Sequence, residues 1–149
     1  MRFEPLRYEH LRQMAEIEKE AFDMPWTENM FIPEVGSPDA TYVVGTRGDE
    51  VICYGGFHSV LDEAHITNIA VKSSERGKGI GKFLMATLIG KAREKGAKYI
   101  TLEVKTTNKS RNLDVRGFRL QCGGRTEEVL QQSLRRLRYV ARHGGACIV

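Results

Sequence analysis

The chain has 149 residues, of which 41% are hydrophobic and 28% are charged, and its net charge is +4 at pH 7. This length suits one domain with a single core, because domains commonly have about 100 to 150 residues, and we expect residues 1–149 to form it. The apolar runs are far shorter than the roughly 20 residues that a membrane-spanning helix needs. No secretory signal is visible at the N-terminus, so we expect a cytoplasmic protein.

The cysteines, histidines and charges do not indicate a metal or a nucleic-acid site. Cys53, Cys122 and Cys147 form no CxxC pair, and the four histidines lack ligand spacing, so we expect neither a metal nor a disulfide framework. The excess positive charge belongs to residues 119–149, which hold six Arg against two Glu, whereas Lys+Arg and Asp+Glu number 17 each before them. That segment lacks a nucleic-acid motif, and we favour a solvated basic surface over RNA binding.

The first part of the chain predicts two helices joined by a bend. Between Tyr8 and Phe22, apolar residues recur at helical spacing among Glu and Lys, which is typical of an amphipathic helix. Residues 23–27 interrupt this pattern, and Thr27 can cap a second short helix that Pro33 ends.

The middle of the chain predicts a meander of strands followed by a helix and another strand. The strand-like runs cover residues 41–46, 51–60, 65–71 and 99–104, and the helix between the last two runs from Ile80 to Gly96. Residues 47–50 suit a hairpin turn. We therefore expect an α/β fold with a mixed, mostly antiparallel sheet flanked by helices.

A glycine-rich loop, residues 73–81, lies between the last strand of the meander and this helix. Glycines permit positive φ and let backbone N–H groups converge on an anion at a helix N-terminus, and Arg76, Lys78 and Lys82 add charge. A Walker A loop is excluded because Phe83 follows Lys82 where a hydroxyl is needed. A Rossmann fingerprint is excluded because the third glycine comes too early. Alone, the loop is consistent with either a diphosphate site or a tight turn.

The loop belongs to a longer series of motifs. The series consists of Ile17-Glu18 with Phe22, Pro25-Trp26-Thr27 with Phe31 and Glu34, Asp62-Glu63, His65 to Val71, Arg76 to Gly81, Leu102-Glu103-Val104, and Asn108-Lys109-Ser110. In this order the motifs resemble the GCN5-related N-acetyltransferase (GNAT) superfamily, in particular the branch of ribosomal-protein-alanine and archaeal N-terminal acetyltransferases. The resemblance implies a sheet with splayed strands at an acetyl-CoA site. It also implies acetylation of the N-terminal α-amino group of a protein, such as a ribosomal or nucleoid protein.

The resemblance implies a role for each matching position of the cofactor site. The backbone of the strand before the loop would contact the pantetheine arm, and the loop would hold the diphosphate. These positions are Ile69, Ala70, Val71, Arg76, Gly77, Lys78, Gly79, Ile80 and Gly81, with Asn108 near the thioester end.

The resemblance also implies the residues that act on the amine. A carboxylate can serve as general base, and Glu103 stands at the position of the proposed base in the bacterial enzymes. Glu34 matches a glutamate implicated in archaeal enzymes, and His65 is a third proton acceptor. Pro25 and Trp26 mark the substrate end, where we expect Trp26 to pack and the backbone of the bend to contact the peptide.

Residues 111–149 depart from the family pattern. Asp114 replaces the tyrosine that the resemblance would assign to protonating the thiolate, and residues 129–137 have helical spacing where strands are expected. Two alternatives therefore stay open. One is an acetyl-CoA-binding protein with impaired catalysis, and the other is an acetyltransferase that acts on a small amine or an internal lysine.

A shift of the reading frame would explain why residues 111–149 depart from the family pattern, and it can be tested. If the codons for residues 125–136 are read one nucleotide later, they permit a peptide that contains the missing tyrosine-rich loop of the family. We hypothesise that a frameshift, in the gene or in the recorded sequence, produced the tail. An intact mass equal to that of the printed chain would show that the tail is real.

Overall fold

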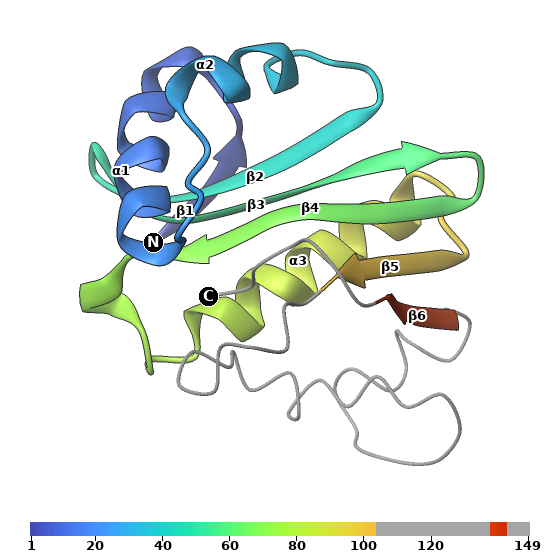
Figure 1. Cartoon of the computed structure of the whole chain (residues 1–149). Coiled ribbons are helices and arrows are strands. Elements are labelled where there is room, and N and C mark those ends of the chain that lie inside the picture. Colours follow the sequence, from blue (N-terminus) through green and yellow to red (C-terminus); the bar gives the residue numbers. More distant parts are fainter. Residues whose placement is uncertain (104–137, 143–149) are drawn as a thin grey trace.

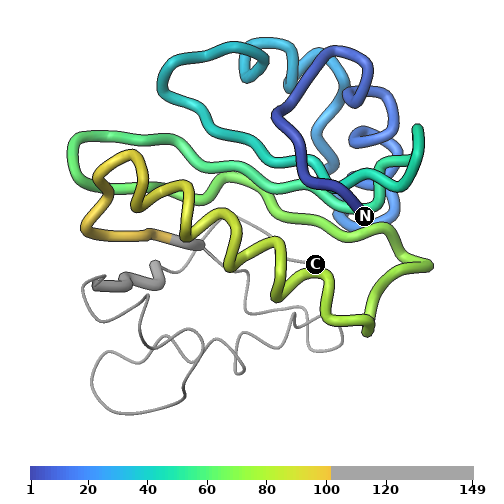
Figure 2. The backbone as a smooth tube through the Cα atoms, turned by 180° about the vertical axis from the view of Figure 1, so that it is seen from behind, coloured from blue at the N-terminus to red at the C-terminus, as the bar shows by residue number. Residues whose placement is uncertain are grey.

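The computed structural model describes residues 1–103 and 138–142, which form one six-stranded sheet in the order β1-β2-β3-β4-β5-β6. Helices α1 and α2 cover one face of the sheet, and α3 covers the other (Figure 1). The view from behind gives the same three layers (Figure 2). The strands are β1 (Arg2–Pro5), β2 (Ala40–Arg47), β3 (Glu50–Val60), β4 (Glu63–Val71), β5 (Tyr99–Glu103) and β6 (Arg138–Arg142). The helices are α1 (Leu11–Ala21), α2 (Glu28–Phe31) and α3 (Ile80–Glu94), and short 3₁₀ turns form at Tyr8–His10, Ile32–Glu34 and Ser73–Glu75.

The strand directions confirm the predicted mixed sheet. Neighbouring strands from β1 to β4 pair antiparallel, whereas β4–β5 and β5–β6 pair parallel. The parallel β4–β5 pair needs a crossover, and α3 supplies it as the helix of the predicted βαβ unit. Within residues 1–103 and 138–142, no helix is long and apolar enough to span a bilayer.

The two predicted N-terminal helices form because each has a face that the sheet can cover. Leu11, Met14 and Ile17 lie on one face of α1 and are buried with Val44 on β2. Phe31 of α2 is fully buried in the same cluster. Thr27 is the N-cap of α2, as predicted, although its hydroxyl makes no capping hydrogen bond.

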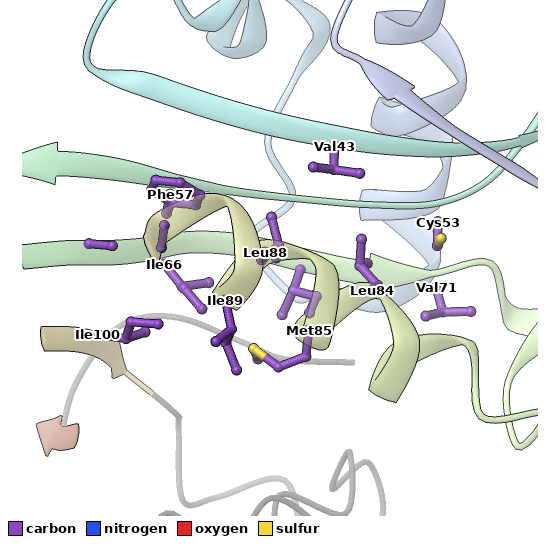
Figure 3. Packing of buried hydrophobic residues seen from close by; sticks show 13 residues of the cluster. Val43, Cys53, Phe57, Ile66, Val71, Leu84, Met85, Leu88, Ile89 and Ile100 are labelled. Carbon is purple, nitrogen blue, oxygen red and sulfur yellow. The ribbon is translucent and has the colours of Figure 1, made fainter. Parts of the chain in front are cut away.

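The opposite face of the sheet forms its core with α3. The side chains of Leu84 and Leu88 point from α3 toward the strands and pack with Phe57 and Ile66 (Figure 3). Past the end of the helix, Gly96 has φ +87°, in agreement with the predicted glycine cap. The core on this face therefore fixes where α3 begins, and with it the position of the glycine-rich loop.

Two strands were not predicted. Strand β1 has only four residues and pairs with β2 at the edge of the sheet, and β6 lies in the atypical tail. The helix predicted over residues 129–137 lies outside the described residues.

Gly56 on β3 leaves room for the ring of Tyr42. A Cβ at Gly56 would lie 2.5 Å from this ring, which is 5% exposed and cannot move freely. Gly56→Ala is therefore expected to lower the free energy of unfolding by about 1–3 kcal/mol, measured by denaturant titration. The control is Gly90→Ala on α3, where no heavy atom lies within 4 Å of the added Cβ. This change should raise stability by about 0.5–1 kcal/mol, and equal losses in both variants would contradict the steric explanation.

Candidate active site

Strand β4 contains a bulge next to the end of its described pairing with β5. This parallel pairing runs from Glu63–Tyr99 to Ile66–Leu102, and within the described residues it goes no further. On the other side of β4, Gly56 pairs with Asn68 and Phe57 with Ile66, so Thr67 is an extra residue. An extra residue bends a strand and interrupts its ladder. Within residues 1–103 and 138–142, the backbone of β4 beyond the bulge, which includes the predicted Ile69, Ala70 and Val71, is paired with β3 alone.

The glycine-rich loop follows directly from this strand. Gly77 has φ +77° and Gly79 has φ +79°, and Gly79 is the N-cap of the 15-residue helix α3. Nothing lies within 4 Å of a Cβ built on either glycine. The first turn of α3, which includes Ile80 and Gly81, contains no acidic residue. Open backbone N–H groups at a helix N-terminus form a site for an anion such as a diphosphate.

Side chains hold the loop in place from both ends. The Nε of Arg76 donates to the carbonyl oxygen of Val71 at 3.0 Å. Glu75 accepts hydrogen bonds from both terminal nitrogens of Arg47 at 3.2 Å, and its other partner is the Nζ of Lys78, also at 3.2 Å. The Arg47 guanidinium and the Lys78 ammonium lower the pKa of Glu75. The carboxylate therefore fixes Lys78 beside the glycines.

Glu34 and a histidine that was not predicted form a close pair on the α1–α2 face. The Oε2 of Glu34 lies 2.6 Å from the Nε2 of His58 on β3. Across the β3–β4 hairpin, His58 lies directly opposite His65, and both are partly exposed. Directly opposite residues point to the same side of a sheet. Two of the three predicted proton acceptors, Glu34 and His65, thus lie near each other with His58 beside both.

The signal that could have revealed His58 is the symmetry of the hairpin. Val60 pairs with Glu63 at its turn, and His58 and His65 lie two residues further along their strands. The predicted strand ends would have paired Val60 with His65 instead, so the histidine pair follows only once the turn is known to lie between Val60 and Glu63.

The bend between α1 and α2 lies beside the same face. The ring of Trp26 is partly buried, with its centroid 5.1 Å from that of Phe31, so Trp26 packs as expected. Pro25 is also partly exposed. The backbone N–H of Trp26 donates to the Oε2 of Glu18 at 2.9 Å, which fixes the backbone of the bend.

Glu18 is buried and was missed as a functional candidate, although its motif carried part of the resemblance. Its Oε1 accepts hydrogen bonds from the Tyr54 hydroxyl and from the Nδ2 of Asn68, the latter at 3.3 Å. The signal in the sequence was a glutamate on the apolar face of α1, four residues after Met14. Burial raises the pKa of Glu18, and its hydrogen bonds with Tyr54, Trp26 and Asn68 offset part of that rise.

The raised pKa of Glu18 predicts a pH dependence of stability. An unfolded glutamate titrates near about pH 4.3, whereas the folded protein keeps this proton to higher pH. The folded state therefore binds more protons in that interval, and this contribution to stability is lost as pH rises through the folded pKa of Glu18. Compared with Glu18→Gln, the wild type should lose free energy of unfolding as pH rises from about 4 to about 8. Denaturant titrations at constant ionic strength measure this difference, and a pH-independent difference would contradict the assignment.

Some predicted site residues lie at or beyond the limit of the described structure. The backbone of Glu103 ends β5, in register with Arg142 of β6 and one residue past the last β4–β5 pair. Only its backbone is described. Asn108 and Asp114 lie outside the described residues. Within the described part of the chain, no group of three or more His, Cys, Asp or Glu side chains could hold a metal ion.

A positive-φ glycine loop at the N-terminus of a long helix, placed between a central strand and that helix, is the kind of site at which transferases hold a phosphate-containing cofactor. Residues 11–113 match the model of the Acetyltransferase (GNAT) family, and the chain belongs to this family. It is an N-acetyltransferase. The predicted fold and the predicted resemblance are confirmed.

Two relatives from this family are similar to the chain over most of its length. The chain is 34% identical over 80% of its length, and 80% of the relative's, to a candidate ribosomal protein bS18-alanine N-acetyltransferase of Bacillus subtilis. It is 32% identical to the ribosomal protein bS18-alanine N-acetyltransferase of Haemophilus influenzae, over 68% of each chain.

Solved structures show the same similarity. The ribosomal-protein-S18-alanine N-acetyltransferase of Escherichia coli superposes with a TM-score of 0.66 at 27% identity, covering 72% of this chain and 69% of that one. The PaiA N-acetyltransferase of Thermoplasma acidophilum, solved with coenzyme A, shares the fold with a TM-score of 0.64 at 17% identity, covering 73% of this chain and 83% of that one.

Proposed function

We propose that this chain acts in the cytoplasm and transfers the acetyl group of acetyl-CoA to the N-terminal α-amino group of a protein. The observation that carries the proposal is the direct path from the bulged strand β4 into the loop with Gly77 and Gly79 at the N-terminus of α3. The names of the relatives favour a ribosomal protein with an N-terminal alanine as the substrate.

The residues of the loop fit the diphosphate of acetyl-CoA. Open space at both glycines, the helix N-terminus and the nearby Lys78 are all suited to an anion. When bound, acetyl-CoA supplies the activated thioester. The backbone of Ile69 to Val71 leads into this loop and would contact the amide-containing arm of the cofactor.

The chain must also remove a proton from the amine. An α-amino group has a pKa near about 8 and is mostly protonated at neutral pH, so a base is needed before the nitrogen can attack the thioester carbon. Glu34 is the base we favour, because its carboxylate contacts His58 and the pair lies on the face beside the bend. Glu103 is the second candidate, since it ends β5 one residue past the last described β4–β5 pair. His65 lies opposite His58 and ranks third.

A release assay for the CoA thiol tests the proposal. A peptide with the first residues of bS18, beginning with alanine, is compared with the same peptide blocked at its α-amine and with a blocked peptide carrying an internal lysine. Release with the first peptide alone, with an added acetyl group on its α-amine by mass spectrometry, is the expected result. Release with the lysine peptide or with small amines would favour a different substrate. Binding of acetyl-CoA without any release would favour the binding protein with impaired catalysis.

A further inference from the structure

We propose that Glu18 is a positioning residue that holds the α1–α2 bend against the bulge of β4, and so sets where the substrate peptide meets the acetyl site. This inference rests on the proposed function. Glu18 is 1% exposed, although most other charged residues of α1 point to solvent. A buried carboxylate is costly unless it is well hydrogen-bonded, and its position therefore requires an explanation.

The hydrogen-bond donors to Glu18 come from three separate parts of the fold. The backbone N–H of Trp26 comes from the bend, the hydroxyl of Tyr54 from β3, and the Nδ2 of Asn68 from β4. Donor and acceptor lie 8, 36 and 50 residues apart in the sequence, respectively. The single carboxylate thus connects the bend to two neighbouring strands at one point.

From Asn68 the contacts continue into the bulge itself. The Tyr42 hydroxyl donates to the Oδ1 of Asn68 at 3.2 Å and lies 3.0 Å from the Oγ1 of Thr67. Thr67, the extra residue of the bulge, also donates to the carbonyl oxygen of Gly56 at 3.3 Å. A continuous polar path therefore runs from the backbone of the bend to the bulge of β4.

The bend depends on Glu18 more than the bulge does. Thr67 and Asn68 lie in a strand that β3 holds by its own ladder, whereas the bend follows the end of α1 and belongs to no strand. An apolar side chain would fill the same space without the cost of burying a charge. An apolar side chain could not accept a hydrogen bond from the backbone N–H of Trp26, however, and so could not fix the direction of the backbone there. Loss of the carboxylate should thus displace the bend and leave β4 in place.

The test compares Glu18→Gln with Glu16→Gln as a control. Glu16 lies on the same helix, and its exposed carboxylate forms an ion pair with Arg12. A carboxamide presents one acceptor oxygen where the carboxylate presents two. In Glu18→Gln, the KM for the alanine peptide should rise about tenfold, as expected when a charged hydrogen bond of roughly 1.5 kcal/mol is lost. The Kd of acetyl-CoA, measured by calorimetry, should stay within about twofold, because a shift of that size is only about 0.4 kcal/mol.

Tryptophan fluorescence gives a readout that does not depend on activity, because Trp26 is the single tryptophan of the chain. Acrylamide should quench Trp26 more strongly in Glu18→Gln than in the wild type, and equally in Glu16→Gln and the wild type. Unchanged quenching and unchanged peptide KM in Glu18→Gln would overturn the inference. An equal rise in peptide KM and acetyl-CoA Kd would also overturn it, since it would indicate general loosening of the fold. If the wild type acetylates no peptide, the proposed function fails, whereas the quenching result still tests the anchoring of the bend.

Discussion

Glu34→Gln is expected to lower kcat for the alanine peptide about 100-fold, within the range of roughly 10²–10⁴ that a general base contributes. The carboxamide keeps the size of the side chain and can still hydrogen-bond His58, whose Nε2 lies 2.6 Å from the Oε2 of Glu34. It cannot accept a proton from the amine. The Kd of acetyl-CoA should stay unchanged, because the proposed diphosphate site lies in the loop after β4.

The control for this prediction is Glu28→Gln in the first turn of α2, where the side chain is exposed. This variant should keep the wild-type kcat. Glu103→Gln is measured in parallel, because Glu103 is the other candidate base. A loss of kcat in Glu103→Gln with normal kcat in Glu34→Gln would transfer the role of base to Glu103 and contradict our preference.

The double variant Gly77→Ala/Gly79→Ala is expected to weaken acetyl-CoA binding about 100-fold. Both glycines have positive φ, and a side chain in that region costs roughly 1–2 kcal/mol per residue. Two such costs amount to about 2–4 kcal/mol, or roughly 30- to 1000-fold in Kd. The added methyl groups meet no atom within 4 Å, so the effect would come from the backbone and not from a clash.

Gly90→Ala is the matched control for the loop variant. It adds the same methyl group to open space, on a helical glycine whose φ is not positive. Calorimetric titration with acetyl-CoA should give a wild-type Kd for Gly90→Ala. An unchanged Kd in the double variant would show that the loop does not need its left-handed conformation to bind, and would contradict the assigned diphosphate site.

Much of the fold was predictable because its signals are local. The meander, α3 and β5 follow from apolar spacing and from glycines at turns, and each lies within one or two residues of its predicted place. The glycine-rich loop was predictable for the same reason, since its position between Val71 and Ile80 depends on neighbours in the chain. The two short strands were not, because β1 has four residues and gains its pairing only from β2.

Residues of the site were predictable only where they lie in a motif that resembles the family. Glu34 and His65 were singled out by resemblance, but nothing in their own neighbourhood indicates that Glu34 contacts His58, 24 residues away. The contacts of Glu18 could not be predicted for the same reason, because its hydrogen-bond partners Tyr54 and Asn68 lie on strands far from α1 in the sequence. The bulge at Thr67 exists only as a mismatch between two paired strands, which one strand alone cannot reveal.

The sequence by itself determined the class of fold, the order of its main elements and the position of the glycine-rich loop, because periodicity and glycine conformation act over a few neighbouring residues. Tertiary structure alone decided that β4 has a bulge at Thr67, that His58 contacts Glu34, and that Glu18 anchors the bend. These features arise from strand register and from burial between layers, where residues up to 50 positions apart in the chain come into contact.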